Sequence, residues 1–387
     1  MYRDFGVVPK ASRDDNFNKP SDDLSPYQLV EPGDLAINKM KAWQGSVAVS
    51  EFRGIVSPAY FIFQASHSQN NRYLHYLLRS AEYTAGYLSI SKGIRPNQWD
   101  LEPQEHSRMP VLLPPLPEQN AIAAFLDRET GKIDALVEEH KRLIELLKEK
   151  RQAVISRAVT KGLDPNARMR PSGVEWLGDV PEHWEVLKFS RCVSIAEGQV
   201  NPEEEPFRSM PLIAPNHIES CTGRLLGLET AAEQGAESGK YLCRRGDVIY
   251  SKIRPALAKA VIAPTDTLCS ADMYPMRGRI GLSQEYLFWL LLTPEFTGWA
   301  VLEADRVAMP KINRESLAGL RLPVPSPTVQ ASISRFLDVQ TRQFDGLLGE
   351  AEKAVRLLQE RRSALISSAV TGKIDVSSMA ELVEAAA

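Results

Sequence analysis

The chain carries one helical sequence twice, about 211 residues apart. Residues 155–160 recur as residues 366–371 with a single change, and residues 125–127 recur unchanged as residues 336–338. The repeated segments cover residues 113–164 and 324–375, and each follows a globular stretch. A period this long is not that of a solenoid, whose repeats are about 20–50 residues long. The chain must therefore fold as two related halves, each made of a globular domain and a long helix.

The globular stretches are weaker copies of one another. Residues 33–41 match residues 246–254 at an offset of 213, and Arg95-Pro96 sits where Met309-Pro310 does. A Pro-rich hinge then leads into the helix in each half. The same offset places the counterpart of Pro181 before Met1. The first globular domain is therefore expected to lack roughly its opening 30–35 residues by comparison with the second.

The repeated helices have the pattern of a coiled coil. Prolines at 114, 115 and 117 predict a helix start near Glu118, because no other proline occurs until Pro165. Seam positions then recur at alternating steps of three and four. The predicted seam contains Ile133, Leu136, His140, Leu143, Leu147, Lys150 and Val154, and Phe344, Leu347, Ala351, Ala354, Leu358, Arg361 and Leu365. The interface is assigned to the apolar members Ile133, Leu136, Leu143, Leu147, Val154, Phe344, Leu347, Leu358 and Leu365. The alternative is that each helix packs only on its own globular domain.

The predicted fold class is α/β. Short apolar runs at 210–214, 246–251 and 258–263, bounded by Gly, Pro and Asp, indicate strands, and 284–292 reads as a buried helix. We expect two α/β recognition domains separated by a long antiparallel coiled coil, with a pseudo-two-fold internal repeat. The predicted boundaries are 1–112 for the first domain, 113–164 for the first helical region, 165–322 for the linker and second domain, 323–376 for the second helical region, and 377–387 for the tail.

Composition excludes several classes of protein. Hydrophobic residues make up 43% and charged residues 25%, which is ordinary for a soluble globular protein. The longest strongly apolar run, 286–292, is too short to cross a bilayer, and the start lacks a signal-peptide pattern, so a cytoplasmic protein is expected. The cysteines at 192, 221, 243 and 269 lie too far apart for a zinc site, and we interpret them as small core residues.

Net charge of −3 means that any contact with DNA must come from local basic patches. Such patches recur at matching places in the two halves. Arg, Lys, Asn and Gln are the side chains that grip phosphates and read base edges. The candidates are Lys39, Lys41, Lys92, Arg95, Asn97 and Gln98 in the first half, and Lys252, Arg254, Lys259, Arg306, Lys311, Asn313 and Arg314 in the second. Each of these residues taken singly could be ordinary surface.

Motifs for catalysis are missing from the sequence. Asn201-Pro202 continues into Glu203, not into the Pro-aromatic sequence of a methyltransferase, and no glycine spacing fits a nucleotide turn. The Gly-Lys pairs lack both the upstream glycine and the following Ser or Thr of a phosphate loop. His183 beside Trp184 reads as part of a structural turn and not as a general base. The chain is expected to be non-catalytic, with no cofactor or metal of its own.

This layout resembles the specificity subunit of type I restriction-modification systems. The resemblance rests on residues 177–184 at a domain start, 114–119 and 125–127 at the helix start, 155–160 at its end, and the second copy of that helix. It covers nearly the whole chain and implies two target recognition domains, each reading half of a bipartite double-stranded DNA sequence. It also implies that the coiled coil docks two modification subunits, which methylate adenine with S-adenosylmethionine, and that ATP-dependent restriction subunits join them. The second hypothesis is a coiled-coil adaptor that binds protein and not DNA.

Overall fold

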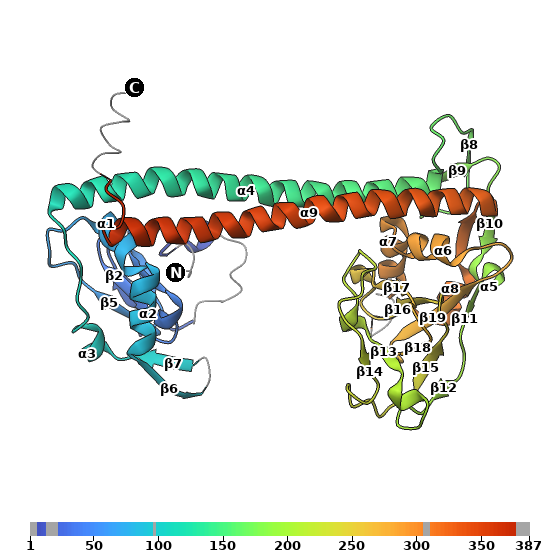
Figure 1. Ribbon diagram of the computed structural model, residues 1–387, viewed down its shortest axis with the longest axis horizontal. Coiled ribbons are helices and arrows are strands. Elements are labelled where there is room, and N and C mark those ends of the chain that lie inside the picture. The colour runs from blue at the N-terminus through green and yellow to red at the C-terminus, as the bar shows by residue number, and fades with distance from the viewer. Residues whose placement is uncertain (1–5, 13–21, 96–97, 305–309, 377–387) are drawn as a thin grey trace. The chain divides into compact units, whose positions relative to one another are not determined.

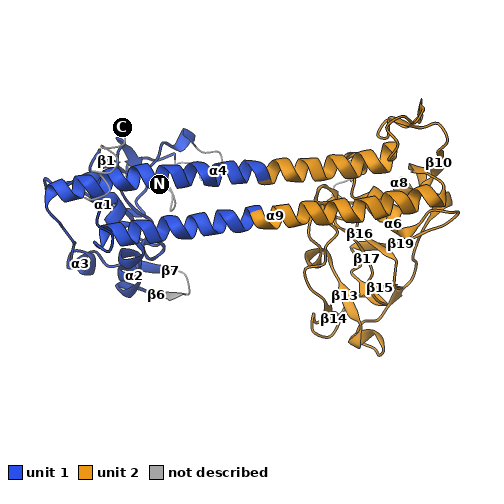
Figure 2. Ribbon diagram, turned by 45° about the horizontal axis from the view of Figure 1, so that its top comes forward, with its two compact units in different colours: residues 1–143, 351–387 blue, residues 144–350 orange. Residues whose placement is uncertain are grey.

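A computed structural model of the protein describes residues 6–12, 22–95, 98–304 and 310–376. The chain divides into two compact units (Figure 2). Unit 1 consists of residues 1–143 and 351–387, and unit 2 consists of residues 144–350. Both long helices therefore contribute one segment to each unit. No helix in the described part of the chain is both long and apolar enough to cross a membrane.

The two long helices are α4 (Leu116–Lys161) and α9 (Pro327–Val370), shown in Figure 1. Proline in the first turn of each helix costs no hydrogen bond there. Just beyond each helix stands a glycine with a positive φ, 78° at Gly162 and 72° at Gly372, a conformation that ends helices and that glycine adopts readily. The two predicted long helices are thus confirmed, and α4 begins two residues before the predicted Glu118.

Within each unit the two helix segments run antiparallel. In unit 1, Arg362 near the end of α9 pairs with Asp134 in the first half of α4 at 2.8 Å. In unit 2, Arg151 near the end of α4 pairs with Asp345 in the first half of α9 at 3.1 Å. Each unit therefore holds the start of one long helix beside the end of the other.

The described residues of unit 1 form three small antiparallel sheets and short helices. Its sheets have the orders β3-β2-β5, β1-β4 and β6-β7. The strands are β1 (Gln28–Val30), β2 (Leu35–Asn38), β3 (Val47–Val49), β4 (Gly54–Val56), β5 (Tyr60–Phe63), β6 (Ser91–Arg95) and β7 (Gln98–Leu101). The helices are α1 (Asn71–Leu78), α2 (Ala81–Ser89) and α3 (Pro103–His106), with 3-10 turns η1 (Lys10–Ser12) and η2 (Ala42–Gln44).

In unit 2, outside residues 305–309, the strands form two larger sheets, with strand orders β11-β19-β16-β17 and β12-β15-β18-β13-β14, and the pairs β10-β20 and β8-β9. The strands are β8 (Met169–Pro171), β9 (Asp179–Pro181), β10 (Glu185–Lys188), β11 (Val193–Ile195), β12 (Gln199–Val200), β13 (Pro211–Ile213), β14 (Glu229–Thr230), β15 (Lys240–Cys243), β16 (Val248–Ser251), β17 (Ala260–Ile262), β18 (Thr267–Cys269), β19 (Met273–Gly278) and β20 (Arg321–Val324). The helices are α5 (Phe189–Cys192), α6 (Gln284–Leu291), α7 (Pro294–Ala304) and α8 (Arg314–Gly319), with 3-10 turns η3 (Phe207–Ser209), η4 (Pro215–His217) and η5 (Pro255–Leu257). The three predicted strands and the predicted buried helix correspond to β13, β16, β17 and α6, which confirms the α/β class.

The internal repeat is visible element by element. Elements β2, β3, β5, α1 and α2 of unit 1 each begin 213 residues before β16, β17, β19, α6 and α7 of unit 2. Turn hydrogen bonds repeat as well: the Asp34 carboxylate accepts the N–H of Glu31, and the Asp247 carboxylate accepts that of Arg244, both at 2.8 Å. The duplication predicted from the helices therefore includes the globular parts.

The core of each unit includes the long helices. In unit 1, Leu126 of α4 and Val370 of α9 belong to the same buried cluster as Leu77 of α1. In unit 2, the corresponding cluster joins Val159 of α4 and Leu337 of α9 to Leu290 of α6. The helices thus pack on globular elements as well as on each other, so the alternative that each helix packs only on its own globular domain is wrong.

Buried polar residues at the helix ends complete this attachment. The side chain of Gln119 accepts the N–H of Asn70 at 3.0 Å, beside the start of α1, and Gln330 accepts that of Ser283 at 2.8 Å, beside the start of α6. Both glutamines are fully buried. Because a buried amide without partners is costly, these bonds fix where each long helix enters its unit.

Candidate nucleic-acid interface

Two loops of unit 2 carry most of its predicted basic residues, and the backbone joins them. The first loop follows β16 and contains Lys252, and the second precedes α8. The N–H of Ile312 donates to the carbonyl of Lys252 at 2.9 Å, and Ile253 forms a β-bridge with Lys311. The N–H of Lys252 also bonds to the carbonyl of Asp272 at 3.0 Å. The fold thus brings together residues that lie about 60 apart in sequence.

An aromatic ring lies between two of these cations. The Lys252 ammonium is 5.5 Å from the ring centre of Tyr274, and the Arg314 guanidinium is 5.4 Å from it, both within cation–π range. The phenol of Tyr274 donates to the Ile312 carbonyl at 3.2 Å, which holds the ring in place. Burial raises the pKa of this phenol, so it stays neutral at physiological pH. Because Tyr274 is only 6% exposed, its ring is a buried support beneath the two half-buried cations.

The remaining candidates of unit 2 divide into exposed and internally bonded residues. Arg254 and Lys311 are exposed, and Arg254 has a φ of 48°, an uncommon conformation for a residue with a side chain. The Lys259 ammonium donates to the Pro215 carbonyl at 2.6 Å. Asn313 caps α8 by accepting the N–H of Ser316 at 2.7 Å. These bonds give Lys259 and Asn313 structural roles in the described chain. The Arg314 guanidinium is also bonded internally, because it donates to the Ala196 carbonyl at 2.7 Å. Arg306 lies outside the described residues.

Unit 1 repeats the arrangement with different side chains. The Lys39 ammonium is 4.7 Å from the ring centre of Phe61, which occupies the place of Tyr274. The N–H of Leu101 donates to the Lys39 carbonyl at 2.9 Å, the counterpart of the bond from Ile312 to Lys252. Lys41 is exposed at the start of η2. The Lys39 ammonium also donates to the Pro58 carbonyl at 2.6 Å, as Lys259 does to Pro215 in unit 2. The same cation and ring pair recurs at the same place in both units.

Other unit 1 candidates lie on the β6–β7 hairpin. Lys92 is exposed and lies 3.6 Å from Glu102, an ion pair of surface type. Arg95 and Gln98 are paired residues of the hairpin ladder, and only their backbone is described. Asn97 lies outside the described residues. The hairpin brings the predicted cluster to one place, although its tip is not part of the described chain (Figure 1).

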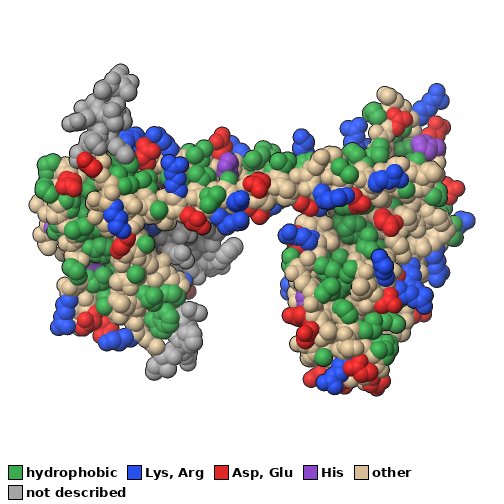
Figure 3. All heavy atoms as spheres, viewed as in Figure 1, with side chains coloured by type: hydrophobic (Ala, Val, Ile, Leu, Met, Phe, Trp, Pro, Cys, Tyr) green, Lys and Arg blue, Asp and Glu red, His purple; other side chains and the backbone are tan. Residues whose placement is uncertain are grey.

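Aromatic residues near these cations were absent from the sequence prediction. Trp43 of η2 and Trp99 of β7 pack with ring centres 4.9 Å apart, and both are half-buried. The Trp43 indole N–H donates to the Met40 carbonyl at 3.0 Å. Their signal in the sequence was the proximity of Trp43 to Lys41 and of Trp99 to Gln98. Figure 3 shows basic and acidic side chains mixed on the visible face of each unit, which agrees with the net charge.

The interface between the helices differs from the predicted seam at several positions. Leu136 and Leu143 are 44% exposed and Leu347 is 55% exposed, so these three assignments are wrong. Each stands directly before a more buried apolar residue, Val137, Ile144 or Leu348, and the heptad phase at these positions was chosen one residue too early. Ile133 and Phe344 are buried, while Leu147, Val154, Leu358 and Leu365 are half-buried. Lys150 and Arg361 are exposed, and the arginine next to Lys150 is the buried one.

Among the described residues, no cluster of His, Cys, Asp and Glu could hold a metal ion. Cys192, Cys243 and Cys269 are buried and free, and Cys221 is half-buried and free. Their interpretation as core residues is confirmed for the three buried ones. Burial raises the pKa of the Cys192 thiol to about 11, which keeps it protonated and unreactive.

Comparison with known proteins identifies relatives. No family model matches the chain. The type I restriction enzyme EcoDI specificity subunit of Escherichia coli is 30% identical over 286 residues, which cover 70% of this chain and 64% of that protein. The MjaVIII specificity subunit of Methanocaldococcus jannaschii is 23% identical over 353 residues, 87% of this chain and 79% of that protein. The chain is a relative of the type I specificity subunits. The resemblance predicted from the repeated helices is confirmed.

A solved structure agrees in fold with these relatives. A chain from a structure described as the basis of complex assembly and conformational transition in the type I R-M system aligns with a TM-score of 0.64. The alignment is 18% identical and covers 89% of this chain and 84% of that one. This likeness supports the fold of a type I specificity subunit. This chain spans less than two thirds of the length of the EcoDI specificity subunit.

Proposed function

We propose that the protein is the DNA sequence-specificity subunit of a type I restriction-modification complex. In this proposal each unit reads one half of a bipartite double-stranded target. The observation that carries the proposal is the recurrence of one basic and aromatic arrangement in both units. Lys39 lies over Phe61 and Lys252 lies over Tyr274, each on a loop tied to a second loop by the same backbone bond. Two copies of one surface suit two half-sites.

The two kinds of side chain in this surface suit different parts of the duplex. Exposed cations such as Lys41, Arg254 and Lys311 can neutralise phosphates, which gives affinity without sequence choice. Arginine can also bond two acceptors of one guanine in the major groove. A conformationally restricted loop fixes the position of such a side chain relative to the groove. Arg254, which has a positive φ, lies in that kind of loop. Specificity would then reside in the loop residues, and affinity in the cations around them.

The long helices are assigned to partner proteins. Large apolar residues on them remain exposed in both units: Leu136, Leu143 and Leu357 in unit 1, and Leu146, Phe336, Val339 and Leu347 in unit 2. Helix surfaces of this kind bind partner helices or grooves. We assign them to modification subunits, two per chain because of the repeat, with restriction subunits completing the complex. The exposed leucines that were wrongly assigned to the seam become candidates for this surface.

Chemistry is assigned to those partners. The chain lacks the sequence motifs for methyl transfer and for ATP binding, so methylation with S-adenosylmethionine and ATP-driven cleavage would take place on the other subunits. The chain itself would be non-catalytic and needs no cofactor. Purified chain should therefore show no methylation of DNA until a modification subunit is added. Methylation by the purified chain alone would contradict this part of the proposal.

The decisive experiment is methylation-site sequencing in cells that express the chain with a modification partner. Replacing Lys252 and Arg254 with Ala should weaken or relax one half-site, and replacing Lys39 and Lys41 should affect the other. The control is the Arg244→Ala and Arg245→Ala double variant, because these exposed arginines lie at the opposite end of β16. It should leave both half-sites intact. Each lost phosphate contact should also reduce the salt dependence of binding by about one power of the salt concentration.

Two results would decide against this proposal. Equal loss at both half-sites from the Lys252 and Arg254 change would contradict the assignment of one reader to each unit. Unchanged DNA binding by all these variants, together with retained binding of the modification subunit, would favour the alternative of a coiled-coil adaptor. The comparison separates DNA reading from assembly because the varied cations lie on the globular loops and not on the long helices.

A further inference from the structure

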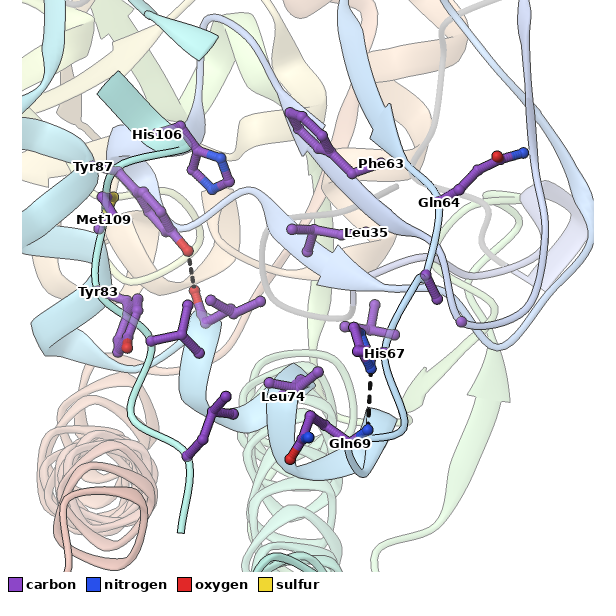
Figure 4. Close-up of a pocket in the computed structure, with 16 residues that line it drawn as sticks. Leu35, Phe63, Gln64, His67, Gln69, Leu74, Tyr83, Tyr87, His106 and Met109 are labelled. Atoms are coloured by element: carbon purple, nitrogen blue, oxygen red, sulfur yellow. Dashed lines mark hydrogen bonds between the residues drawn. The ribbon is translucent and has the colours of Figure 1, made fainter. Parts of the chain in front are cut away.

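Unit 2 contains a polar cavity between β13 and the turn that leads into β15. Its volume is about 400 Å³, which leaves room for a group much larger than a water molecule. Lys240, Ser238 and Ser270 are among the residues that line it. The cavity of unit 1 shown in Figure 4 differs in chemistry, because apolar side chains such as Leu35 and Phe63 make up most of its lining. A ligand of the unit 2 cavity must therefore be polar or charged.

Lys240 brings a nearly buried positive charge to this cavity. The residue is only 8% exposed. Its ammonium donates to the backbone carbonyl of Ser238 and, at 2.8 Å, to the hydroxyl of the same residue. Both acceptors are neutral, and no carboxylate of the described residues lies within 4.0 Å of this nitrogen. Since lysine is rarely buried without an opposite charge beside it, Lys240 is suited to bind an anion.

The pKa of Lys240 agrees with this interpretation. Burial lowers the pKa of its ammonium, and the negative charge of Asp272 opposes that shift. Asp272 is an exposed residue, so water screens much of its charge. An anion in direct contact with the ammonium would offset the cost of burying the charge more effectively.

Two hydroxyl groups add further hydrogen-bond donors to the cavity. The Ser238 hydroxyl oxygen accepts from Lys240, and the Ser270 hydroxyl oxygen accepts the N–H of Asp272 at 3.2 Å. Each hydroxyl therefore keeps its own proton for a ligand. Glu237 also lines the cavity, but it is exposed to water, which screens its charge. One ammonium and two hydroxyls match the oxygen atoms of a phosphate group, for which lysine is a common partner.

A single turn joins the cavity to the basic loops of unit 2. Ser270, which lines the cavity, follows directly after β18. In the same turn the Asp272 carbonyl accepts the N–H of Lys252 at 3.0 Å, and the Lys252 carbonyl accepts the N–H of Ile312 at 2.9 Å. The cavity therefore adjoins the surface that we assign to DNA. Each strand of a duplex presents a phosphate about every 3.4 Å along the helix axis, so a phosphate contact can continue from one site to the other.

Unit 1 has a different residue at the corresponding place. The offset of 213 residues relates β15 to β1 and pairs Lys240 with Tyr27. A tyrosine does not carry the positive charge of a lysine. A contact that depends on Lys240 should therefore be confined to the half-site of unit 2.

We propose that this cavity binds one phosphate group of the DNA backbone beside the half-site that unit 2 reads, with the Lys240 ammonium as its charged partner. Ser238 and Ser270 donate to the remaining phosphate oxygens. Contacts to phosphates fix the register of a protein on the duplex and carry no sequence information themselves. Lys240 thus positions the reading loops and does not choose bases. The inference rests on the proposed function.

The Lys240→Met variant tests the proposal in DNA binding by the full-length chain together with a modification subunit. Methionine keeps an unbranched apolar side chain in the buried site and removes the charge. We expect binding about tenfold weaker, because a hydrogen bond to a charged group is lost, with an unchanged sequence preference. The slope of log K against log salt concentration should become shallower by about one. The control is Lys188→Met, at an exposed lysine of β10 in another sheet, which should leave affinity and slope unchanged.

A scan of the DNA backbone identifies the phosphate. Each phosphate in turn is replaced by a neutral methylphosphonate. At one position beside the half-site of unit 2, wild type should lose about tenfold in affinity, whereas Lys240→Met should lose nothing further, because its partner is already absent. If every position that weakens wild type weakens the variant equally, Lys240 contacts no phosphate and the proposal is wrong.

The remaining outcomes separate this inference from the proposed function. Absence of sequence-specific DNA binding by the wild-type complex would contradict both. Wild-type binding together with an unchanged salt slope for Lys240→Met would refute the inference alone, and a lower thermal midpoint of that variant would then assign Lys240 to the fold. Saturable binding of inorganic phosphate that Lys240→Met abolishes, with an unchanged slope for DNA, would assign the cavity to a free anion and contradict the DNA contact.

Discussion

Arg151 and Arg362 occupy equivalent places in the two repeats, and the structure predicts very different consequences for their loss. Arg151 of α4 pairs with Asp345 of α9, and Arg362 of α9 pairs with Asp134 of α4. The Arg151 side chain is only 4% exposed, whereas that of Arg362 is 33% exposed. The Arg151 guanidinium also donates to the carbonyls of Cys221 and Thr222 at 3.1 and 3.3 Å. It therefore fastens a loop of unit 2 to the long helices.

These contacts determine the expected magnitudes. A hydrogen bond to a charged group contributes about 1.5–3 kcal/mol, and bonds that share one side chain do not add fully. Arg151→Ala removes one ion pair and two such bonds, and we expect a loss of about 3 kcal/mol in the local stability of unit 2. Arg362→Ala removes a partly exposed ion pair, which contributes about 0–1 kcal/mol. Added salt should weaken the Arg362 pair more than the Arg151 pair.

Native-state hydrogen exchange of the amides at 219–224 is the appropriate assay, because a chain with two units need not unfold in one step. A loss of about 3 kcal/mol corresponds to exchange on the order of 100-fold faster. Arg151→Lys, which keeps the charge without the planar fork, should lie between wild type and Arg151→Ala. Equal exchange in the Arg151→Ala and Arg362→Ala variants, or unchanged exchange at 219–224, would show that burial of Arg151 does not anchor the loop.

Three further predictions follow from the same structure. Ile133→Asp should destabilise the paired helices of unit 1 by several kcal/mol, whereas Leu136→Asp should change the thermal midpoint little, since only Ile133 is buried. Burial lowers the pKa of His75 to about 3, from an unfolded value of 6.5. The contribution of neutral His75 to the free energy of unfolding is therefore complete above pH 6.5 and is lost as the pH falls, because the unfolded chain takes up a proton first. Urea titrations should show a loss of about 2 kcal/mol between pH 8 and pH 5, and the His75→Gln variant should show a smaller loss. Arg254→Gly should relieve a positive φ and stabilise unit 2 by about 1 kcal/mol in thermal unfolding while weakening DNA binding, and a loss of stability would contradict the strain argument.

The long helices were predictable because local chemistry determines their ends. Proline at the start and glycine at the end act within one turn, and both leave a plain signal in the sequence. The phase of the seam was not predictable with the same certainty. At Leu136-Val137 and Leu143-Ile144, two adjacent apolar residues fit alternate phases equally well, and only tertiary packing selects between them. Arg151 adds to the ambiguity. A charged residue at a buried position breaks the apolar pattern from which the interface positions are predicted.

The candidate site was predictable in part. Lysines and arginines recur at fixed offsets in the two halves, and this recurrence indicates the basic loops without structural information. The ring between Lys252 and Arg314 was not predictable, because Tyr274 is placed there by strand pairing between β16 and β19. Likewise the cap on α8 and the bond to Pro215 occupy Asn313 and Lys259, and no pattern in the sequence distinguishes them from exposed candidates.

The two copies differ in length near the basic loops. This supports the proposal that the strands and helices form a common framework and that the loops read DNA. From β2 to α2, the elements of unit 1 begin 213 residues before their counterparts in unit 2. Beyond α2 the offset becomes 211, because Leu101 and Ile312 make the same backbone bond to Lys39 and Lys252. Counted from the start of α2, the first copy therefore contains two more residues before this bond than the second copy contains from the start of α7, and this stretch includes Lys92, Arg95 and Gln98. A change of loop length alters which atoms reach a groove while the flanking strands keep their register. A change of length in such a loop is what two readers of different half-sites would require, whereas a purely structural repeat gives no reason for the change to fall there.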